Sequence, residues 1–187
     1  MKVIVNNNVA FRKVATENLH DFENLFQKRG APKSCWCTAW RNIRPALKND
    51  PLAKKREMQQ RITGGEPVGI LGYINGEPIA WCSVAPRETY RPSMADVIDD
   101  DENKNIWSIV CFFVLREFRG EGLLVQLIQA AETHAAQCGA TVIEAYPVDP
   151  DSPSYRFGGF LSVFEELGYE QLGRKGSRRY VVRKSIQ

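Results

Sequence analysis

Two glycines lie in a short stretch whose residue types suit the binding of an anion. The stretch reads Arg119-Gly120-Glu121-Gly122-Leu123-Leu124. Glycine lets the backbone bend sharply and approach a ligand closely. If a helix begins here, its first unpaired N–H groups and the positive end of its dipole point at that ligand. The stretch therefore predicts an anion-binding turn, although it matches neither a P-loop nor the G-x-G-x-x-G pattern.

The segments on either side predict the strand and the helix that such a turn needs. Residues 109–115 form a continuous apolar run rich in branched and aromatic side chains, as in a strand covered on both faces. After the turn, apolar residues recur at helical spacing until Gly139 supplies a stop signal. Residues 141–146 read as a second buried strand. Residues 106–146 therefore predict a crossover unit joining two parallel strands.

A second concentration of reactive side chains lies near the N-terminus. It reads Ser34-Cys35-Trp36-Cys37-Thr38-Ala39-Trp40-Arg41. A structural zinc site needs about four ligands, and no matching Cys or His pair accompanies the two thiols, so no metal site is expected. Three interpretations stay open: packed aromatics with buried thiols, a redox pair, and a wall of a substrate pocket. In the last, Trp36, Trp40 and Arg41 would hold the substrate by stacking and charge.

The turn and the strand before it resemble the pyrophosphate motif of the GNAT superfamily of N-acetyltransferases. That motif runs Arg/Gln-x-x-Gly-x-Gly/Ala, and Arg119, Gly122 and Leu124 occupy its named positions. The family's lead-in, Val-x-x-x-x-Arg-Gly, is matched by Val114, Arg119 and Gly120. Leu124 departs from the small residue expected there. Its N–H can still donate, but its side chain could crowd the diphosphate.

The resemblance covers residues 64–183 by the order of elements and is specific within residues 110–146. It implies an enzyme that moves the acetyl group of acetyl-CoA to a primary amine of a small molecule or peptide, by direct transfer in a ternary complex. The strand before the turn would hold pantetheine and supply an oxyanion donor, and the turn would bind the diphosphate. The implied cofactor contacts are Phe112, Phe113, Val114, Arg119, Gly120, Glu121, Gly122, Leu123, Leu124 and Phe164.

The resemblance does not identify the general base or the general acid. Many family members place a Glu on the strand that corresponds to residues 106–115, and this strand has no carboxylate. Deprotonation through water is therefore as well supported as any side chain. The family's acidic tyrosine falls on Phe164, which has no proton to give. Tyr146, at a predicted strand end, and Tyr155 are the remaining general-acid candidates.

Composition sets plain limits on other functions. The 187 residues are 25% charged and 43% hydrophobic, with a formal net charge of +3. This charge is too small to indicate a nucleic-acid partner. The sequence has no sustained apolar stretch, so neither a signal peptide nor a membrane span is expected. Five cysteines, an odd number spread through core-like runs, indicate free thiols in a reducing compartment, and we expect the cytoplasm.

The remaining elements surround the crossover unit. Thr16 is expected to cap a helix over residues 17–28, and a second helix is expected over residues 51–63. Asn75-Gly76 predicts a hairpin. Further predictions are a helix over residues 158–168 and a closing hairpin over residues 170–183. The non-periodic residues 86–105 carry Asp96, Asp99, Asp100, Asp101 and Glu102, which are either a solvated charge run or an attractor for a cationic amine.

We expect one domain over residues 1–187, of the α+β class and the GNAT fold. It would contain a central mixed, mostly antiparallel sheet with one parallel crossover unit, flanked by helices. Residues 1–63 would border the acceptor site, residues 64–146 would form the core sheet and cofactor unit, and residues 147–187 would add a helix and a hairpin.

Two further functions stay open. The missing tyrosine and strand carboxylate leave room for a non-catalytic acyl-CoA-binding or sensor protein. Cys35 and Cys37 leave room for a thiol redox module. The sequence does not decide the oligomeric state, and a homodimer is one candidate.

Overall fold

The computed structural model describes residues 9–92 and 105–186. The acidic residues noted above, Asp96, Asp99, Asp100, Asp101 and Glu102, lie outside the described residues. The first strand is β1 (Ala10–Lys13).

Within these residues seven strands form one sheet in the order β1-β2-β3-β4-β5-β7-β6. After β1 the strands are β2 (Ile70–Ile74), β3 (Glu77–Pro86), β4 (Ile106–Val114), β5 (Val142–Ala145), β6 (Glu170–Lys175) and β7 (Arg179–Ser185). Only β4 and β5 pair in parallel, and every other pair is antiparallel. The predicted mixed sheet with one parallel crossover unit is therefore confirmed.

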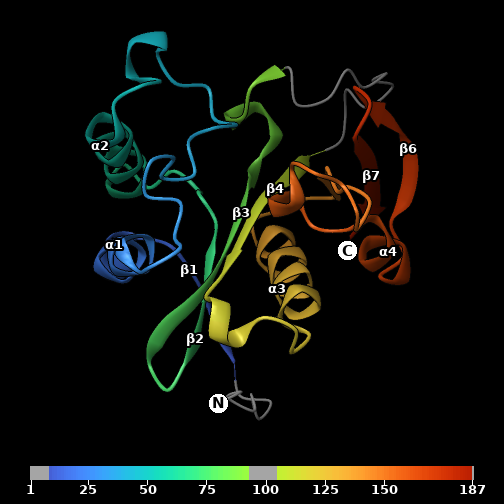
Figure 1. Ribbon diagram of the computed structural model, residues 1–187, viewed down its shortest axis with the longest axis horizontal. Helices are drawn as coiled ribbons and strands as arrows, with labels where there is room; N and C mark the ends of the chain where they lie inside the picture. The colour runs from blue at the N-terminus through green and yellow to red at the C-terminus, as the bar shows by residue number, and fades with distance from the viewer. Residues whose placement is uncertain (1–8, 93–104, 187) are drawn as a thin grey trace.

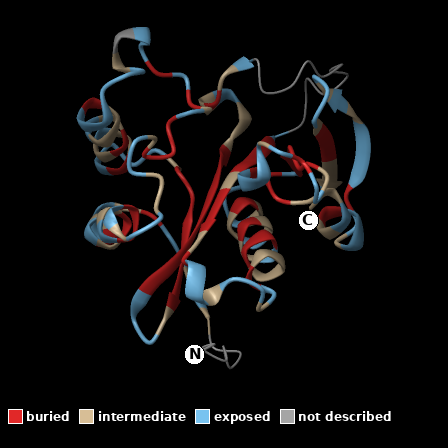
Figure 2. Cartoon of the chain, in the orientation of Figure 1, coloured by how far each residue is buried: buried red, intermediate tan, exposed pale blue. Residues whose placement is uncertain are grey.

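Four α-helices of the described residues cover the two faces of this sheet. They are α1 (Leu19–Gln27), α2 (Pro51–Thr63), α3 (Leu123–Gln137) and α4 (Leu161–Glu166). Helices α1 and α2 lie on one side and α3 and α4 on the other (Figure 1). The buried residues follow the central strands and the inner faces of the helices (Figure 2). The core is therefore split into two layers by the sheet.

Two helix predictions differ from the structure at their N-terminal ends. Thr16 does not cap an α-helix, because a 3-10 turn over Thr16–Asn18 comes first and Asn18 Oδ1 accepts the Ala15 N–H at 2.8 Å. The helix expected over residues 158–168 begins only at Leu161. Gly159, with φ of +84°, has a left-handed conformation that an α-helix cannot continue through.

Strand β4 contains a bulge and is paired with β5 over only part of its length. Ser83 of β3 faces Cys111, but the next residue of β3 faces Ile109, so Val110 is an extra, bulged residue. Pairing with β5 covers only residues 106–109 of β4, and residues 110–114 continue without β5 beside them. Bulges of this kind bend a strand and interrupt its ladder, and they are common next to active sites.

Candidate active site

A cavity of about 800 Å³ opens beside the part of β4 that has no β5 partner. This volume is typical of a small-molecule site. Four parts of the chain form its wall: the segment after α1, strand β4, the turn before α3, and the segment before α4. Among the described residues, the lining set is Gly30, Pro32, Cys35, Cys37, Ala39, Trp40, Cys111, Phe112, Phe113, Val114, Phe118, Arg119, Gly120, Gly122, Leu123, Leu124, Arg156, Phe157 and Phe160.

The turn before α3 has the backbone conformation that its glycines predicted. Gly120 has φ of +82° and Gly122 has φ of +73°. A Cβ at either position would meet nothing within 4 Å, so the conformation, and not a lack of space, requires glycine. Arg119 Nε donates to the carbonyl of Val114 at 2.8 Å and ties the turn to the end of β4.

Helix α3 begins directly after Gly122 and presents its first amides next to this turn. The first backbone hydrogen bond of the helix runs from the Gln126 N–H to the Gly122 carbonyl at 3.4 Å. The amides of Leu123 and Leu124 precede it and have no acceptor inside the helix. With the positive end of the helix dipole they form a site that favours a negative charge.

Strand β4 contributes Phe112 and Phe113 to the cavity wall, although these residues are only 9% and 7% exposed. Phe112 lies 6.4 Å from Phe164 on one face of the sheet, and Phe113 lies 6.5 Å from Phe26 on the other. A ligand that runs along residues 112–114 would therefore meet an extended strand beside the bulge.

The segment before α4 closes the cavity from the opposite side. Gly159 lies so close to β4 that a Cβ would stand 3.0 Å from the ring of Phe164 and 3.3 Å from that of Phe112. Arg156, Phe157 and Phe160 of the same segment line the cavity. The motif reasoning missed these three residues, because only the tertiary fold brings the segment against β4.

Most of the predicted cofactor contacts share this cavity wall. Phe112, Phe113, Val114, Arg119, Gly120, Gly122, Leu123 and Leu124 all line it. Glu121 lies in the same turn, and Phe164 is fully buried behind Phe112. The side chain of Leu124, which differs from the expected small residue, also packs in part against the hydrophobic core.

The predicted acceptor contacts are divided between the cavity and the core. Trp40 lines the cavity, and its ring lies beneath the Arg179 guanidinium at 4.6 Å. Trp36 is buried and stacks on Phe26 at 5.6 Å. The Arg41 side chain is 0% exposed and lies behind the wall. Contact of Trp36 and Arg41 with an acceptor stays a prediction.

The two candidate general acids lie outside the lining set. The Tyr146 hydroxyl donates to the buried Glu144 and lies 3.3 Å from Ser108 Oγ, and burial raises the pKa of Tyr146 well above its usual value. Tyr155 is 37% exposed, and its ring faces Arg179 at 5.3 Å. Their acid role stays a prediction.

The thiols, by contrast, come together at the cavity. Cys35, Cys37 and Cys111 all line it, with the buried Cys82 on the adjacent strand β3. Cys111 is half-buried at the cavity wall. All five cysteines are free. The described part of the chain contains no group of three or more Cys, His, Asp or Glu side chains arranged to hold a metal ion.

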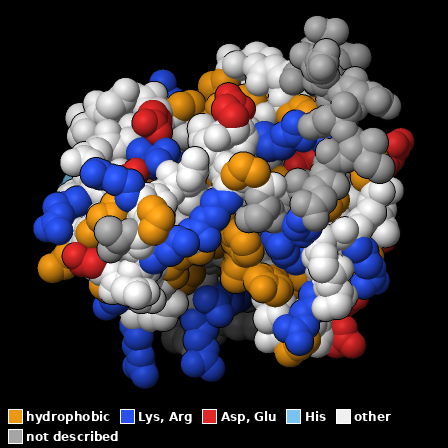
Figure 3. Space-filling view, turned by 90° about the horizontal axis from the view of Figure 1, so that it is seen from above, with side chains coloured by type: hydrophobic (Ala, Val, Ile, Leu, Met, Phe, Trp, Pro, Cys, Tyr) orange, Lys and Arg blue, Asp and Glu red, His pale blue; other side chains and the backbone are white. Residues whose placement is uncertain are grey.

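Two properties of the larger surface complete the description. Seen from above, hydrophobic side chains gather in the middle of the face, with Lys and Arg side chains beside them (Figure 3). Over residues 9–92 and 105–186, no helix combines the length and apolar character needed to cross a membrane.

Comparison with known proteins gives both a family match and a set of structures of similar fold. The model of the acetyltransferase (GNAT) family matches residues 34–160, from the start of the thiol segment to the end of the cavity wall. No curated protein sequence matches the chain significantly.

Among solved structures, the PaiA N-acetyltransferase from Thermoplasma acidophilum, in complex with coenzyme A, is 13% identical with a TM-score of 0.55, covering 96% of this chain and 99% of that one. The GNAT domain of S. lividans PAT is 14% identical with a TM-score of 0.62, and the match covers 100% of this chain and 95% of that one. An agmatine N-acetyltransferase is 10% identical with a TM-score of 0.62, and the match covers 96% of this chain and 100% of that one. At these identities the structures show a shared fold.

Proposed function

The chain belongs to the acetyltransferase (GNAT) family, and on that premise we propose that it moves the acetyl group of acetyl-CoA directly to a primary amine of a small molecule or peptide. The observation that carries the proposal is the continuity of the glycine turn with the open part of β4 along one cavity wall. Coenzyme A has the matching order of parts, an anionic diphosphate followed by an extended pantetheine arm. A solved protein of the same fold binds coenzyme A.

The residues of the turn fit the diphosphate. The amides of Leu123 and Leu124 and the guanidinium of Arg119 would hold it, since charge-assisted hydrogen bonds to a phosphate are strong. The open space beside Gly120 and Gly122 leaves room for such a group to approach the backbone. The side chain of Leu124 lines the same cavity and packs in part against the core.

Strand β4 would then position the reacting end. Pantetheine would hydrogen-bond to the backbone of residues 112–114, and a backbone N–H beside the bulge would polarise the carbonyl as it gains negative charge. The donor supplies an acetyl thioester, so the protein has to deliver a neutral amine and protonate the departing thiolate. No step requires a covalent enzyme intermediate.

The cavity also limits the kind of amine. None of its described lining residues is acidic, and Arg119 and Arg156 bring positive charge. Its remaining wall is aromatic, aliphatic and thiol. We therefore propose an acceptor with an apolar or aromatic body, and with neutral or anionic substituents in place of further amino groups. A cytoplasmic location and a homodimer stay predictions.

The test combines coenzyme A binding with transfer to amines. We expect isothermal titration calorimetry to detect coenzyme A, and thiol release from acetyl-CoA to rise when apolar primary amines such as benzylamine are added. Binding without transfer to any amine of a broad panel would favour the acyl-CoA-binding or sensor alternative. Absence of coenzyme A binding would overturn the proposal.

A further inference from the structure

Three aromatic rings from two distant segments meet beside the cavity. The ring of Trp40 lies 6.0 Å from that of Tyr155 and 6.3 Å from that of Phe157, and the last two rings are 6.0 Å apart. Trp40 and Phe157 line the cavity. Because rings with centroids about 4.5–7 Å apart attract one another, an aromatic ligand that entered the cavity would extend this cluster.

Two of the three rings are exposed, although the chain buries most of its large apolar side chains. Tyr155 is 37% exposed and Phe157 is 40% exposed. Among the described residues, the other exposed large hydrophobic side chains are Leu52 in α2 and Leu172 in β6, which lie on separate elements. Neighbouring exposed aromatic side chains beside a cavity are typical of a binding site.

The backbone that carries Phe157 is held in place by the residues that follow it. The Val148 N–H donates to the Gly159 carbonyl at 3.0 Å. At Gly158 a Cβ would stand 2.7 Å from the carbonyl oxygen of Tyr146, so this backbone packs directly against the end of β5. The ring of Phe157 is therefore presented by a fixed segment, which lowers the entropic cost of binding a ligand there.

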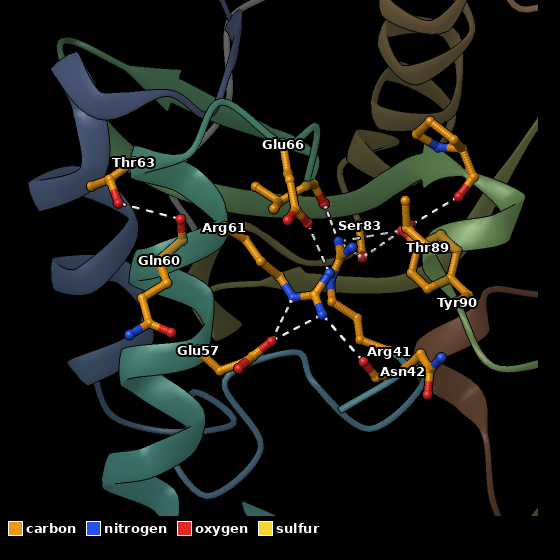
Figure 4. A network of polar contacts seen from close by, with 12 residues as sticks. Arg41, Asn42, Glu57, Gln60, Arg61, Thr63, Glu66, Ser83, Thr89 and Tyr90 are labelled. Atoms are coloured by element: carbon orange, nitrogen blue, oxygen red, sulfur yellow. Dashed lines mark hydrogen bonds and ion pairs between the residues drawn. The ribbon is translucent and has the colours of Figure 1, made fainter. Parts of the chain in front are cut away.

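Trp40 is fixed from behind by its neighbour Arg41. In Figure 4 the Arg41 side chain points toward Tyr90, and its guanidinium lies 4.8 Å from the centre of that ring. Its Nη2 also donates to the Val68 carbonyl at 2.7 Å. The Trp40 carbonyl accepts the Arg91 N–H at 2.9 Å. Trp40 therefore has a fixed backbone as well, and Arg41 positions this wall of the cavity from within the core.

A cationic side chain lies next to the rings. Arg156 directly precedes Phe157, is exposed and lines the cavity, and its guanidinium lies 5.4 Å from the centre of the Phe160 ring. The proposed reaction uses Arg119 for the diphosphate and gives Arg156 no task. An arginine that stacks on a ring still presents the N–H groups at its edge, and these fit the two oxygens of a carboxylate.

The rings stand close to the place where the acetyl group would lie. Trp40 and Cys111 pack against the same buried cluster, next to the bulge of β4. Gly159 packs on the ring of Phe112, and Phe157 is only two residues before it, which limits the separation of their Cα atoms to about 7 Å. A ring held here can reach the acetyl group only through an amine on a short linker.

We propose that Trp40, Phe157 and Arg156 select the acceptor, and that it is a primary amine joined by a short linker to an aromatic ring and carrying a carboxylate. This inference rests on the proposed function and narrows its acceptor class. The ring packs on Trp40 and Phe157, and the carboxylate accepts hydrogen bonds from Arg156. The carboxylate can lie beside the amine, as in phenylalanine, or across the ring, as in 4-(aminomethyl)benzoate, and these two probes distinguish the positions.

The first test compares amines at a fixed concentration of acetyl-CoA, with kcat/KM expressed per unprotonated amine. Benzylamine should exceed cyclohexylmethylamine, which has a similar shape and no aromatic ring, by about tenfold, since one contact between rings contributes a factor of about 2–12 beyond the area it buries. Phenylalanine or 4-(aminomethyl)benzoate should exceed benzylamine by about tenfold again. Equal values for benzylamine and cyclohexylmethylamine, or values for both acids no higher than that of benzylamine, would overturn the proposal.

The second test changes the rings of the protein. Phe157→Leu keeps an apolar side chain at an exposed position and removes the ring. It should lower kcat/KM about fivefold with benzylamine and less than twofold with cyclohexylmethylamine, whereas a structural disturbance would lower both equally. Trp40→Leu should act in the same direction. Equal losses with the two amines in both variants would count against the aromatic site and overturn the proposal.

The third test changes the charge. Arg156→Gln should lower kcat/KM about tenfold with the preferred acid and leave both the value for benzylamine and the affinity for coenzyme A unchanged. Arg56→Gln, at an exposed position of α2 outside the lining set, makes the same change of net charge and should affect none of the three. Weaker coenzyme A binding in Arg156→Gln would assign the guanidinium to the cofactor, and equal losses in the two variants would show a general charge effect. Either result overturns the proposal.

Binding without turnover separates this inference from the function on which it rests. Calorimetry should detect phenylalanine or 4-(aminomethyl)benzoate binding to the complex of the protein with coenzyme A, and Phe157→Leu and Arg156→Gln should each weaken that binding about fivefold or more. If an acid binds in this way and no amine is acetylated, the proposed function is overturned and the ligand class of the site stands. If alkylamines are acetylated and neither acid binds, the acetylation stands and this proposal is overturned.

Discussion

Two of the four parts of the cavity wall, the glycine turn and the thiol segment, differ in how they acquire their chemistry. The turn over residues 119–124 uses backbone amides and glycine conformations, which are local properties of a strand-to-helix junction. The thiol segment around Cys37 uses side chains from separate stretches: Cys35 and Cys37 line the cavity with Cys111 of β4, and Trp81 of β3 donates its indole N–H to Cys37 Sγ at 3.2 Å. The glycine turn can be recognised in a short stretch of sequence, whereas the thiol segment forms its contacts only when the chain folds.

This contrast separates two kinds of sensitivity to substitution. A backbone site should tolerate changes of side chain and fail when the φ angle of a glycine is disturbed. A site built from buried side chains should fail when one of those side chains changes. The predictions below test that division in order of expected effect.

The largest effect should follow from removing the guanidinium. We expect Arg41→Met to lower the free energy of unfolding by about 1.5–3 kcal/mol, since it removes the hydrogen bonds that the guanidinium donates to the Val68 carbonyl and Ser83 Oγ and leaves those buried acceptors without it. The measurement is urea unfolding followed by circular dichroism. In the double variant Arg41→Met/Ser83→Ala part of that loss should be recovered, with a coupling of about 0.5–3 kcal/mol. Additive effects of the two substitutions would show that the side chains do not interact.

A smaller effect should follow from one methyl group in the turn. Gly122→Ala should weaken coenzyme A binding about tenfold, because a left-handed alanine costs about 1–2 kcal/mol and would shift the first amides of α3. Gly176→Ala is the matched control, since Gly176 has φ of +66°, open space around it and a place in the β6–β7 turn. Calorimetry should find its affinity unchanged. Equal weakening in both variants would argue against a site at the turn.

The pH dependence of the free energy of unfolding should again distinguish the thiol segment from the glycine turn. The pKa of Cys37 is lowered to about 6 by the hydrogen bond from Cys111 and by Arg41. A lowered pKa means that the stabilisation is complete above the unfolded-state pKa and is lost as the pH falls through about 6. Relative to Cys37→Ser, the wild type should gain on the order of 1 kcal/mol between pH 6 and pH 7, about 2–4 °C in Tm. A constant difference would show that folding does not lower the pKa of Cys37.

The sequence predicted the elements well where the signal is local. The helix over residues 51–63 was predicted with the bounds that α2 has, because Pro51 begins it and Gly64 ends it. The crossover unit was also predicted from local patterns, whereas the mixed, mostly antiparallel sheet followed from the family resemblance. The helix expected over residues 158–168 is shorter, since nothing in its apolar spacing shows that Gly159 must be left-handed to pass between Phe112 and Phe164.

The sequence predicted the turn, but it did not predict the thiol cluster. Cys35 and Cys37 stood out by composition, yet Trp81, which donates to Cys37, and Cys111, which lines the same cavity, lie 44 or more residues away, in strands whose own periodicity indicates only packing. Arg41 illustrates the same limit. The sequence suggested a contact with the acceptor, and only the fold reveals that its charge is buried and lacks a carboxylate partner among the described residues.

The smallest effect should come from the residue that departs most from the family motif. Leu124→Ala should change the dissociation constant of coenzyme A by no more than about threefold, which corresponds to less than 1 kcal/mol. Its N–H, which the substitution keeps, provides the contact with the anion, and its side chain packs in part on the core. The measurement is calorimetry beside Gly122→Ala. A tenfold gain in affinity would show that the leucine side chain crowds the diphosphate, and the turn would then depend on side chains as the thiol segment does.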